Sequence, residues 1–363
     1  MRKQAVIFTG GGTGGHLYPA IAVSNKLREK APELRLVFVG SKRKIEETLM
    51  KKEGIEFFKL PIKGLKGRGL RALDTLMLLP FAFLKSLIIF LKVRPCLVVG
   101  AGSYSAGPLV LLASMMKTPA LILEQNLFPG YTNRLLLPKV DKAVVAFEES
   151  LPYFKGKGVF LGNPVREDFY SIPPKERTGP LTLLIFGGSQ GSHFLNLAVL
   201  TTLPFLQKEK NSLMIFHQTG PKDLELVKTG YQKHSFRLVK VAAYFHNMAE
   251  FFSKSDLIIC RAGATTIAEI IAAKKTALLI PFSRATEGHQ LQNARLLAEK
   301  KAAELMTEEN FSPENLAAKI LGFLENRESL DQFERNLDSF RSEDTAGKIA
   351  GLCFQMMKNR KKE

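Results

Sequence analysis

The sequence has few of the residues from which disulfide frameworks and metal sites are built. Its 363 residues include only three cysteines, Cys96, Cys260 and Cys353, and no CxxC pair. Cys96 and Cys260 lie in apolar, strand-like runs, so we expect buried free thiols and a reducing cytosolic environment. The six histidines show no spacing typical of metal ligands. The composition therefore favours a site that contains no bound metal.

Long apolar runs are also absent. Arg2 and Lys3 are followed by only a short apolar run before Gly10, so we expect a first strand there rather than a secretory signal. The most apolar stretch, residues 76–91, is interrupted by Pro80 and Lys85. A membrane span needs about 20 apolar residues, so this stretch is too short to be one.

Acidic residues are scarce: 34 Asp and Glu stand against 52 Lys and Arg, a formal net charge of +18. The chain has no nucleic-acid recognition motif and no aromatic-rich basic strand, so we expect no nucleic-acid partner. Four basic residues lie just before the apolar segment 73–91, namely Lys63, Lys66, Arg68 and Arg71. An anionic membrane surface attracts each by about 1 kcal/mol, which favours an interfacial helix. A solvated loop on a basic protein is the alternative.

Strand-like and helical patterns alternate along the chain with short connections. In the first half, strands are expected at 4–9, 35–39, 56–60, 96–100, 120–123, 142–145 and 158–161, with helices at 18–30, 42–53, 70–92, 105–117 and 129–138. After a linker rich in proline and glycine, strands recur at 181–186, 213–217, 236–239, 256–260, 277–280 and 302–305. This alternation predicts an α/β protein of about two domains with mostly parallel sheets.

Three glycine-rich loops, each after an apolar strand-like run, are the most informative feature. They read Gly10-Gly11-Gly12-Thr13-Gly14-Gly15-His16, Gly100-Ala101-Gly102-Ser103-Tyr104 and Gly187-Gly188-Ser189-Gln190-Gly191-Ser192. Backbone N–H groups of such a loop can close on an anion at a helix N-terminus. A tight strand-to-helix turn is the alternative for any single loop. Three loops indicate two nucleotide-type half-domains that face one phosphorylated ligand.

The first loop also satisfies the dinucleotide pattern GxGxxG, at Gly10, Gly12 and Gly15. That reading requires an acid after the second strand to hold the ribose, but the strand is followed by Ser41-Lys42-Arg43-Lys44. NAD is therefore not expected, whereas an NADP site remains an alternative. No Asp-x-Asp occurs in the chain, so phosphate charge would be met by backbone dipoles and by Arg or Lys.

Seven motifs, taken in order, resemble those of one family. They are Gly11-Gly12-Thr13-Gly14-Gly15-His16, Gly102-Ser103-Tyr104-Ser105-Ala106-Gly107-Pro108, Glu124-Gln125-Asn126, Gly162-Asn163-Pro164-Val165-Arg166, Gly187-Gly188-Ser189-Gln190-Gly191, Arg261-Ala262-Gly263-Ala264-Thr265-Thr266 with Glu269, and His289-Gln290 with Asn293-Ala294. The chain is similar to the MurG family, the UDP-GlcNAc:lipid I N-acetylglucosaminyltransferases of peptidoglycan synthesis. The motifs run from residue 10 to 294 and cover nearly the whole chain.

The resemblance implies two Rossmann-like domains facing across a cleft, the GT-B glycosyltransferase fold. Residues 1–163 would form the acceptor and membrane domain, with a C-terminal helix at about 343–363 packed back on it, and residues 164–342 the UDP-GlcNAc donor domain. The implied reaction is an inverting, metal-independent transfer of GlcNAc to the MurNAc 4-hydroxyl of lipid I, giving lipid II. No cofactor is implied. The implied location is peripheral, on the cytoplasmic face of the bacterial inner membrane, with its anionic surface as a partner.

Donor-binding residues follow from the resemblance, position by position. Ser189, with Gln190 and Gly191 beside it, would contact phosphate, although a helix cap is an alternative role for Ser189. Glu269 would hold the ribose, and we place it in the first turn of the helix after Cys260, where it could instead act on the helix dipole. Phe245, through its backbone, and Arg166 would lie near uracil. The remaining donor positions are Thr13, Gly14, Gly15, Asn126, Arg261, Ala264, Thr265, Thr266 and Gln290.

The acceptor hydroxyl must lose a proton as it attacks the sugar. His16 ends the first glycine loop at the start of a helix, where the helix dipole favours a neutral imidazole, so we expect it to be the base or to position the acceptor. Glu124 is the second candidate base. Gly14, Gly15, Gly102 and Ser103 would hold the acceptor pyrophosphate. Two alternatives remain: a related transferase acting on another lipid such as diacylglycerol, and a non-catalytic lipid-pyrophosphate binder.

Overall fold

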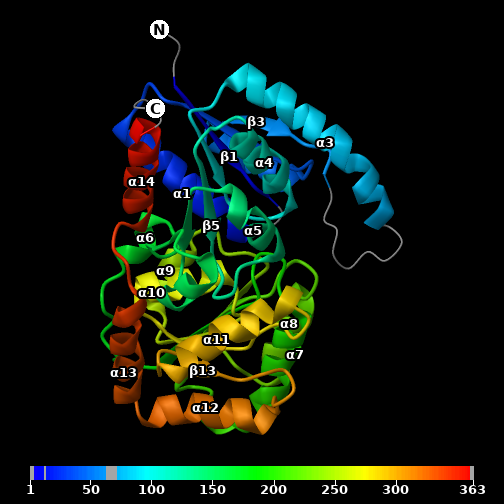
Figure 1. The fold of residues 1–363 in the computed structure, drawn as a ribbon. Helices are drawn as coiled ribbons and strands as arrows, with labels where there is room; N and C mark the ends of the chain where they lie inside the picture. The colour runs from blue at the N-terminus through cyan, green and yellow to red at the C-terminus, as the bar shows by residue number, and fades with distance from the viewer. Residues whose placement is uncertain (1–3, 12–13, 63–71, 360–363) are drawn as a thin grey trace. The chain divides into compact units, whose positions relative to one another are not determined.

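The computed structural model describes residues 4–11, 14–62 and 72–359. By its internal contacts the chain divides into two compact units: residues 1–166 together with 342–363, and residues 167–341. Strands and helices alternate along both units (Figure 1). The chain thus builds an α/β unit twice, and its C-terminal segment returns to the first.

The first unit is built on a parallel seven-stranded sheet in the order β3-β2-β1-β4-β5-β6-β7. Its strands are β1 (Ala5–Thr9), β2 (Arg35–Gly40), β3 (Glu56–Lys59), β4 (Leu97–Gly100), β5 (Ala120–Glu124), β6 (Lys142–Val145) and β7 (Gly158–Phe160). Its helices are α1 (Gly14–Lys30), α2 (Lys44–Lys52), α3 (Ala72–Val93), α4 (Gly107–Met115), α5 (Tyr131–Leu136) and α14 (Thr345–Asn359).

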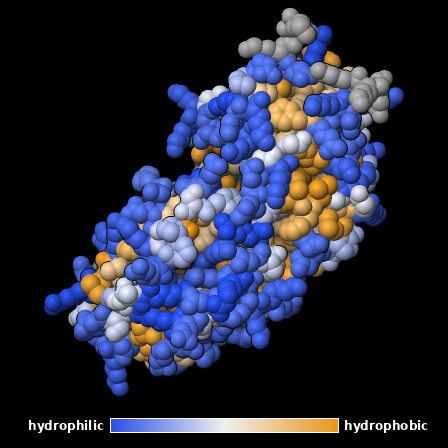
Figure 2. Space-filling view, turned by 90° about the vertical axis from the view of Figure 1, so that its left-hand side faces the viewer, coloured by the Kyte–Doolittle hydropathy of each residue, from blue (hydrophilic) through white to orange (hydrophobic). Residues whose placement is uncertain are grey.

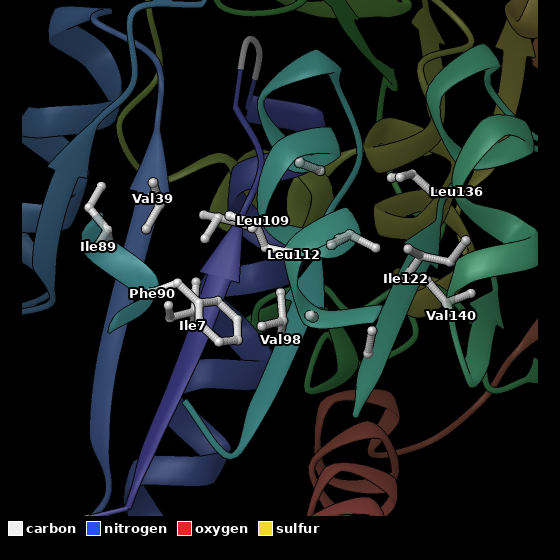
Figure 3. Packing of buried hydrophobic residues seen from close by; sticks show 14 of the residues in the cluster. Ile7, Val39, Ile89, Phe90, Val98, Leu109, Leu112, Ile122, Leu136 and Val140 are labelled. Carbon is white, nitrogen blue, oxygen red and sulfur yellow. The ribbon is translucent and has the colours of Figure 1, made fainter. Parts of the chain in front are cut away.

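Successive residues of β1 serve opposite faces of this sheet, as the strand period of two requires. Ile7 belongs to a core cluster with residues of α3, α4 and α5, whereas Phe8 belongs to a cluster with residues of α1 and α14. Both side chains are fully buried. Figure 3 shows the first cluster, in which Phe90 of α3 and Leu109 of α4 lie against the strands. Helices cover both faces, so the strands read as continuous apolar runs.

The C-terminal helix α14 supplies part of the core of the first unit. It packs on α1, and Ile349, Ala350 and Cys353 are completely buried in the same cluster as Phe8. Apolar residues recur at positions 349, 353 and 356 or 357, which gives the helix one continuous buried stripe. One face of the first unit's sheet is therefore covered by α1 together with α14, a segment that follows the whole second unit in sequence.

The second unit is built on a parallel six-stranded sheet in the order β10-β9-β8-β11-β12-β13. Its strands are β8 (Leu181–Phe186), β9 (Leu213–Gln218), β10 (Val239–Ala242), β11 (Leu257–Cys260), β12 (Thr276–Leu279) and β13 (Glu304–Leu305). Its helices are α6 (Glu167–Tyr170), α7 (His193–Thr202), α8 (Leu224–Lys233), α9 (Met248–Lys254), α10 (Ala264–Ala273), α11 (His289–Glu299), α12 (Pro313–Glu325) and α13 (Glu328–Asn336).

Both sheets are wound outward in two directions from their first strand. β1 lies between β2 and β4, and β8 lies between β9 and β11. In doubly wound sheets, ligands bind outside the carboxyl ends of the strands at this reversal of strand order. The two parallel sheets confirm the predicted fold class, two Rossmann-like α/β halves. In each sheet the glycine-rich loops follow strands at the reversal of strand order.

One strand differs from the sequence-based prediction. A strand was expected at 236–239, but β10 begins at Val239. After α8 the chain passes through Ser235 in a left-handed conformation (φ 53°), and Phe236 is buried in the helix-packed core rather than in the sheet. Phe236 is therefore apolar because it packs in the core next to the sheet, and not because it belongs to a strand.

The surface is mostly hydrophilic where Figure 2 displays it, with hydrophobic residues gathered in limited areas. The helix α3 carries an apolar exposed face, because Phe81, Leu84, Ile88 and Leu91 are each more than half exposed. Among the described residues, no helix combines the length and the apolar character needed to cross a membrane. The four basic residues expected at a membrane, Lys63, Lys66, Arg68 and Arg71, lie outside the described residues.

We predict that the first unit depends on α14 for its stability. Replacing the fully buried Ile349 with alanine should cost about 2–5 kcal/mol of unfolding free energy, because it leaves a cavity between α14 and the sheet. Urea unfolding followed by circular dichroism, together with hydrogen exchange of β1 and β4, measures the effect. The control is Gln355→Ala on the exposed side of the same helix, which should change stability by less than about 0.5 kcal/mol. Equal effects of the two substitutions would mean that α14 is not part of this core.

Candidate functional site

The third glycine loop follows β8 and lies against the loop that follows β9. Gly191 and Gly220 both have positive φ, 75° and 76°. A Cβ atom on Gly191 would collide with the carbonyl oxygen of Thr219, and one on Gly220 would collide with that of Gln190. The two loops are therefore in direct backbone contact, and only glycine fits at either position. Ser189 and Gln190 are exposed on this loop.

A buried glutamine ties this loop to the predicted uracil-binding segment. Gln218, the last residue of β9, is 1% exposed. Its side-chain Nε2 donates to the carbonyl of Gly188 (3.1 Å), and its Oε1 accepts from the backbone N–H of Phe245 (2.7 Å). Sequence reasoning missed Gln218. A polar residue that ends an apolar strand beside a glycine loop is a signal that could have found it.

The helix after the third loop begins with a serine cap. Ser192 Oγ accepts from the backbone N–H of Leu195 (3.4 Å) and from Nε of Arg261 (3.0 Å). The alternative role considered for Ser189, a helix cap, thus falls to Ser192, three residues later. The first turn of α7 contains no acidic residue. Its N-terminus presents the positive end of the helix dipole beside Ser189, Gln190 and Gly191, as an anion site requires.

Arg261 holds the end of β11 in place. It forms an ion pair with Glu308 (2.6 Å) and donates to the carbonyls of Ile280 (3.1 Å) and Pro281 (3.2 Å). Burial lowers the pKa of Arg261 from its ordinary value, and the Glu308 carboxylate opposes that shift. Because Arg261 also reaches the cap Ser192, it links the loops after β8, β11 and β12.

The helix α10 follows β11 after a short loop and starts at Ala264. Its N-cap Gly263 has an extended backbone and provides no side-chain cap. Thr265 and Thr266 are half-buried in the first turn. Glu269 is the sixth residue of α10, so the expectation that it lies in the first turn is wrong. The cause is the loop of residues 261–263, which delays the start of the helix and weakens the dipole role for Glu269.

Gln290, the second residue of α11, has its side chain fixed at one end. Its Oε1 accepts from the backbone N–H of Phe282 (2.9 Å). Within the described part of the chain its amide nitrogen has no such bond, so it can act as a donor toward a ligand. Its neighbour His289 is paired with Glu287 (3.3 Å), which favours a structural role for His289.

In the first unit, His16 meets the motif after β5. His16 is the third residue of α1, and its Nδ1 lies 3.1 Å from Oε1 of Gln125. Because the Gln125 amide nitrogen donates to the carbonyl of Ala101 (3.2 Å), the Gln125 oxygen faces His16 and accepts its Nδ1 proton. With a proton on Nδ1, the ring has Nε2 as the nitrogen that can accept a proton.

The second glycine loop packs directly on His16. Gly102 has φ 98°, and a Cβ atom there would lie 2.8 Å from Nδ1 of His16. The next residue, Ser103, also has positive φ (65°), which is uncommon for a residue with a side chain. Ser103 Oγ lies 2.9 Å from Ser105 Oγ. Three predicted residues, His16, Gly102 and Ser103, are thus brought together at the carboxyl ends of β1 and β4.

Both oxygens of Glu124 accept hydrogen bonds from the loop that follows it and from α5. Oε1 accepts from the backbone N–H (3.0 Å) and side chain (3.2 Å) of Asn126, and Oε2 accepts from the N–H of Gly130 and the side chain of Asn133 (both 2.8 Å). Its side chain is buried. To act as a base it would have to break these bonds, so the geometry favours His16.

A second carboxylate that the sequence did not reveal lies beside the first glycine loop. Glu46 is fully buried, and its oxygens accept from the backbone N–H and Oγ of Ser41 (both 2.6 Å). A Cβ atom on Gly11 would lie 2.7 Å from the Glu46 carboxylate. This charge disfavours an anion at Gly11. It leaves Gly14 and Gly15, at the start of α1, as the part of the loop suited to phosphate.

Two predicted donor residues remain. Thr13 lies outside the described residues. Arg166 is exposed at the end of residues 1–166 of the first unit. Among the described residues, no group of three His, Cys, Asp or Glu side chains could hold a metal ion.

A buried polar chain underlies the third glycine loop. His217 Nε2 lies 3.0 Å from Asn196 Oδ1, and its Nδ1 lies 3.0 Å from Tyr231 Oη. Asn196 donates to the carbonyl of Thr219 (2.9 Å) and to Asp223 (2.7 Å), so its oxygen is left to accept from His217. Burial lowers the pKa of His217 to about 3. His217 is therefore neutral and fixes the residues against which Gly191 packs.

Comparisons with known proteins cover almost the whole chain. The model of the glycosyltransferase family 28 N-terminal domain matches residues 6–145, and that of the C-terminal domain matches residues 182–349. Two relatives, from Anaeromyxobacter sp. (strain Fw109-5) and Syntrophus aciditrophicus (strain SB), are each named UDP-N-acetylglucosamine--N-acetylmuramyl-(pentapeptide) pyrophosphoryl-undecaprenol N-acetylglucosamine transferase. The first is 39% identical over 98% of this chain and 94% of its own length. The second is 40% identical over 97% of this chain and 99% of its own length.

Solved structures agree with these matches. The crystal structure of MurG from Acinetobacter baumannii has a TM-score of 0.79 and 27% identity, over 96% of this chain and 98% of that one. The glycotransferase of kitacinnamycin has a TM-score of 0.71 at 13% identity, over 98% and 100% of the two chains. The second likeness concerns the fold alone.

The pKa of His217 predicts a pH-dependent stability. Unfolding returns this pKa from about 3 to about 6.5, so below pH 6.5 the unfolded chain takes up a proton that the folded chain does not. The stability contributed by His217 is full above pH 6.5 and falls by about 1.4 kcal/mol per pH unit below it. His217→Gln should reduce the change in the urea unfolding midpoint between pH 7 and pH 5. His246→Gln, at an exposed histidine, should leave that change as it is in wild type. An unchanged slope in His217→Gln would contradict this assignment.

Proposed function

This chain belongs to glycosyltransferase family 28, and on that premise we propose that it transfers N-acetylglucosamine from UDP-GlcNAc to the MurNAc 4-hydroxyl of lipid I. The product is lipid II, a precursor of peptidoglycan. The observation that carries the proposal is the likeness, over 97–98% of the chain, to transferases named for these substrates. The site geometry described above supports it, whereas nothing in that geometry favours a nucleic-acid partner.

We place the UDP-GlcNAc donor on the unit of residues 167–341. The diphosphate binds at Ser189, Gln190 and Gly191, where the α7 N-terminus stabilises the negative charge that develops on the leaving UDP. The first turn of α10 adds Ala264, Thr265 and Thr266 to the same edge of the sheet. Glu269 accepts hydrogen bonds from the ribose, Phe245 borders the uracil, and the Gln290 amide donates to a sugar hydroxyl.

We place the lipid I acceptor on the unit that contains β1 to β7. Gly14, Gly15, Gly102 and Ser103 hold its pyrophosphate. His16 Nε2 takes the proton of the 4-hydroxyl, whose oxygen attacks C1 of the sugar as the bond to UDP breaks. A single displacement of this kind inverts the configuration at C1. Glu124 serves to shape the loop that carries Asn126.

We further propose that the protein acts peripherally at the cytoplasmic face of the bacterial inner membrane. The acceptor in the relatives' names carries undecaprenol, which is confined to a bilayer. Phe81, Leu84, Ile88 and Leu91 of α3 give the first unit an exposed apolar face, as an interfacial helix requires. Four basic residues precede this helix in sequence and supply positive charge for an anionic surface, namely Lys63, Lys66, Arg68 and Arg71.

A transferase that acts on another lipid, such as diacylglycerol, is the second candidate. The exposed apolar face of α3 suits any lipid acceptor, and the loops assigned to the donor do not discriminate between acceptors. The contact of His16 with a second glycine loop at Gly102 and Ser103 favours an acceptor that carries phosphate. Diacylglycerol carries none, so acceptor selectivity decides between the two.

The direct test is transfer of radiolabelled sugar from UDP-GlcNAc to a lipid I analogue, with EDTA present. We expect turnover to be almost unchanged by EDTA, because the leaving charge is met by the α7 N-terminus and by backbone N–H groups. Diacylglycerol should accept no label. Activity that is lost in EDTA and restored by Mg²⁺ or Mn²⁺ would contradict the metal-independent mechanism, and labelled diacylglycerol would favour the second candidate.

Two substitutions should separate donor binding from chemistry. Glu269→Ala should weaken UDP-GlcNAc binding by about 1–3 kcal/mol, since it leaves ribose hydroxyls unpaired. His16→Ala should lower kcat by about 10²–10⁴-fold and leave UDP affinity, measured by calorimetry, nearly intact. Glu250→Ala, at an exposed glutamate of α9, is the control for loss of a carboxylate. If His16→Ala abolishes UDP binding instead, His16 is structural and the base lies elsewhere.

A further inference from the structure

An apolar cavity of about 850 Å³ lies in the first unit, between α3, α4 and α5. Its wall consists almost entirely of aliphatic and aromatic side chains. The residues that the argument uses are Leu79, Phe83 and Leu87 of α3, Gly107 of α4, Leu135 of α5 and Tyr104. A volume of this size holds a sizeable ligand, and nothing in the mechanism above uses it.

The cavity lies beside the exposed apolar face of α3, and Leu84 belongs to both. Ala82, Ile89, Phe90 and Val93 are buried against the sheet, as Figure 3 shows for Ile89 and Phe90. Phe81, Ile88 and Leu91 project into solvent on the face that suits a bilayer. Leu79, Phe83 and Leu87 lie between these faces, half-buried, and line the cavity. Because these three residues pack against the core cluster and exposed Leu84 also lines the cavity, the apolar wall runs from the core to the outer surface, as in an open binding groove.

The cavity adjoins the segment that follows the loop assigned to the acceptor pyrophosphate. Tyr104, on its wall, directly follows Gly102 and Ser103. Consecutive Cα atoms are about 3.8 Å apart, so a pyrophosphate held by Gly102 and Ser103 would lie close to the cavity wall at Tyr104. Gly107 of the same segment also lines it.

We propose that this groove binds the first isoprene units of the acceptor's polyprenyl chain. This inference rests on the proposed function, because the chain is fixed to the pyrophosphate that the function supplies. The groove would select acceptors by the lipid adjoining the phosphate, in addition to the bilayer contact made by the outer face of α3. Methyl-branched isoprene units suit a wall of leucine and phenylalanine, since burial of each carbon strengthens binding by about fourfold.

Gly107 allows the groove to be filled with little disturbance of the fold. It has ordinary helical angles (φ −50°, ψ −58°), and a Cβ atom on it would meet nothing within 4 Å. Gly107→Leu therefore places an apolar side chain in the cavity. Gly107→Ala controls for the change in backbone freedom, and Gly351→Leu, at an exposed glycine of α14 with equally open surroundings, controls for an added leucine elsewhere.

The experiment compares two acceptor analogues with the same sugar, peptide and pyrophosphate, one ending in a polyprenyl chain and one in a methyl group. In detergent solution, Gly107→Leu should raise the KM of the prenylated acceptor by roughly 10–100-fold. It should leave the KM values of the methyl analogue and of UDP-GlcNAc, and sedimentation with anionic vesicles, within about twofold of wild type. Both controls should behave as wild type.

Other outcomes overturn the proposal. An equal rise for both acceptors means that the substitution disturbs the pyrophosphate loop, and no rise for either means that the chain does not enter the groove. Loss of vesicle binding with unchanged KM values makes the groove a bilayer contact. Direct binding of a fluorescent polyprenyl diphosphate, which needs no turnover, must also be weakened by Gly107→Leu. If wild type binds this probe but glycosylates neither acceptor, the proposed function is wrong, whereas the proposal that the groove binds a polyprenyl chain is retained.

Discussion

The close approach of two backbone loops at the carboxyl ends of β8 and β9 is the constraint on which the donor half of this protein depends. Gly191 and the loop of Thr219 and Gly220 touch without an intervening side chain. This contact fixes the path of residues 187–192 into α7, and with it the direction in which the loop's N–H groups and the helix dipole point. In the first unit a glycine also allows a close approach, but there Gly102 packs on the side chain of His16.

Buried side chains hold these loops where the backbone alone would not. Gln218 bridges Gly188 and Phe245, and Arg261 reaches from β11 to the Ser192 cap. Each such bond is worth about 1 kcal/mol, but a partner left unpaired in the interior costs more. The loops are therefore preorganised before any ligand arrives, which is the condition under which fixed dipoles stabilise a developing charge efficiently.

The glycine motifs and the doubly wound fold could be predicted from the sequence because both follow from local sterics and strand patterning. The pairing of His16 with Gln125, which fixes the imidazole tautomer, could not, since the two residues are 109 positions apart. The same holds for Gln218 and for Glu46 beside Gly11. The sequence-based prediction puts Glu269 one turn too early, because the length of the loop after β11 has no clear signal in the sequence. Side-chain partners across strands are set by tertiary packing, which a single sequence does not encode locally.

The central claim is that the third glycine loop binds the donor diphosphate through its backbone. Calorimetric titration of wild type and Gly191→Ala with UDP and with uridine, both in EDTA, tests it most directly. Wild type should bind UDP roughly 100-fold more tightly than uridine, as about two charge-assisted hydrogen bonds imply. Gly191→Ala should bind both with similar, weak affinity, while its uridine affinity stays close to that of wild type. A variant that keeps the full preference for UDP, or a wild type that shows it only with Mg²⁺, would contradict the account.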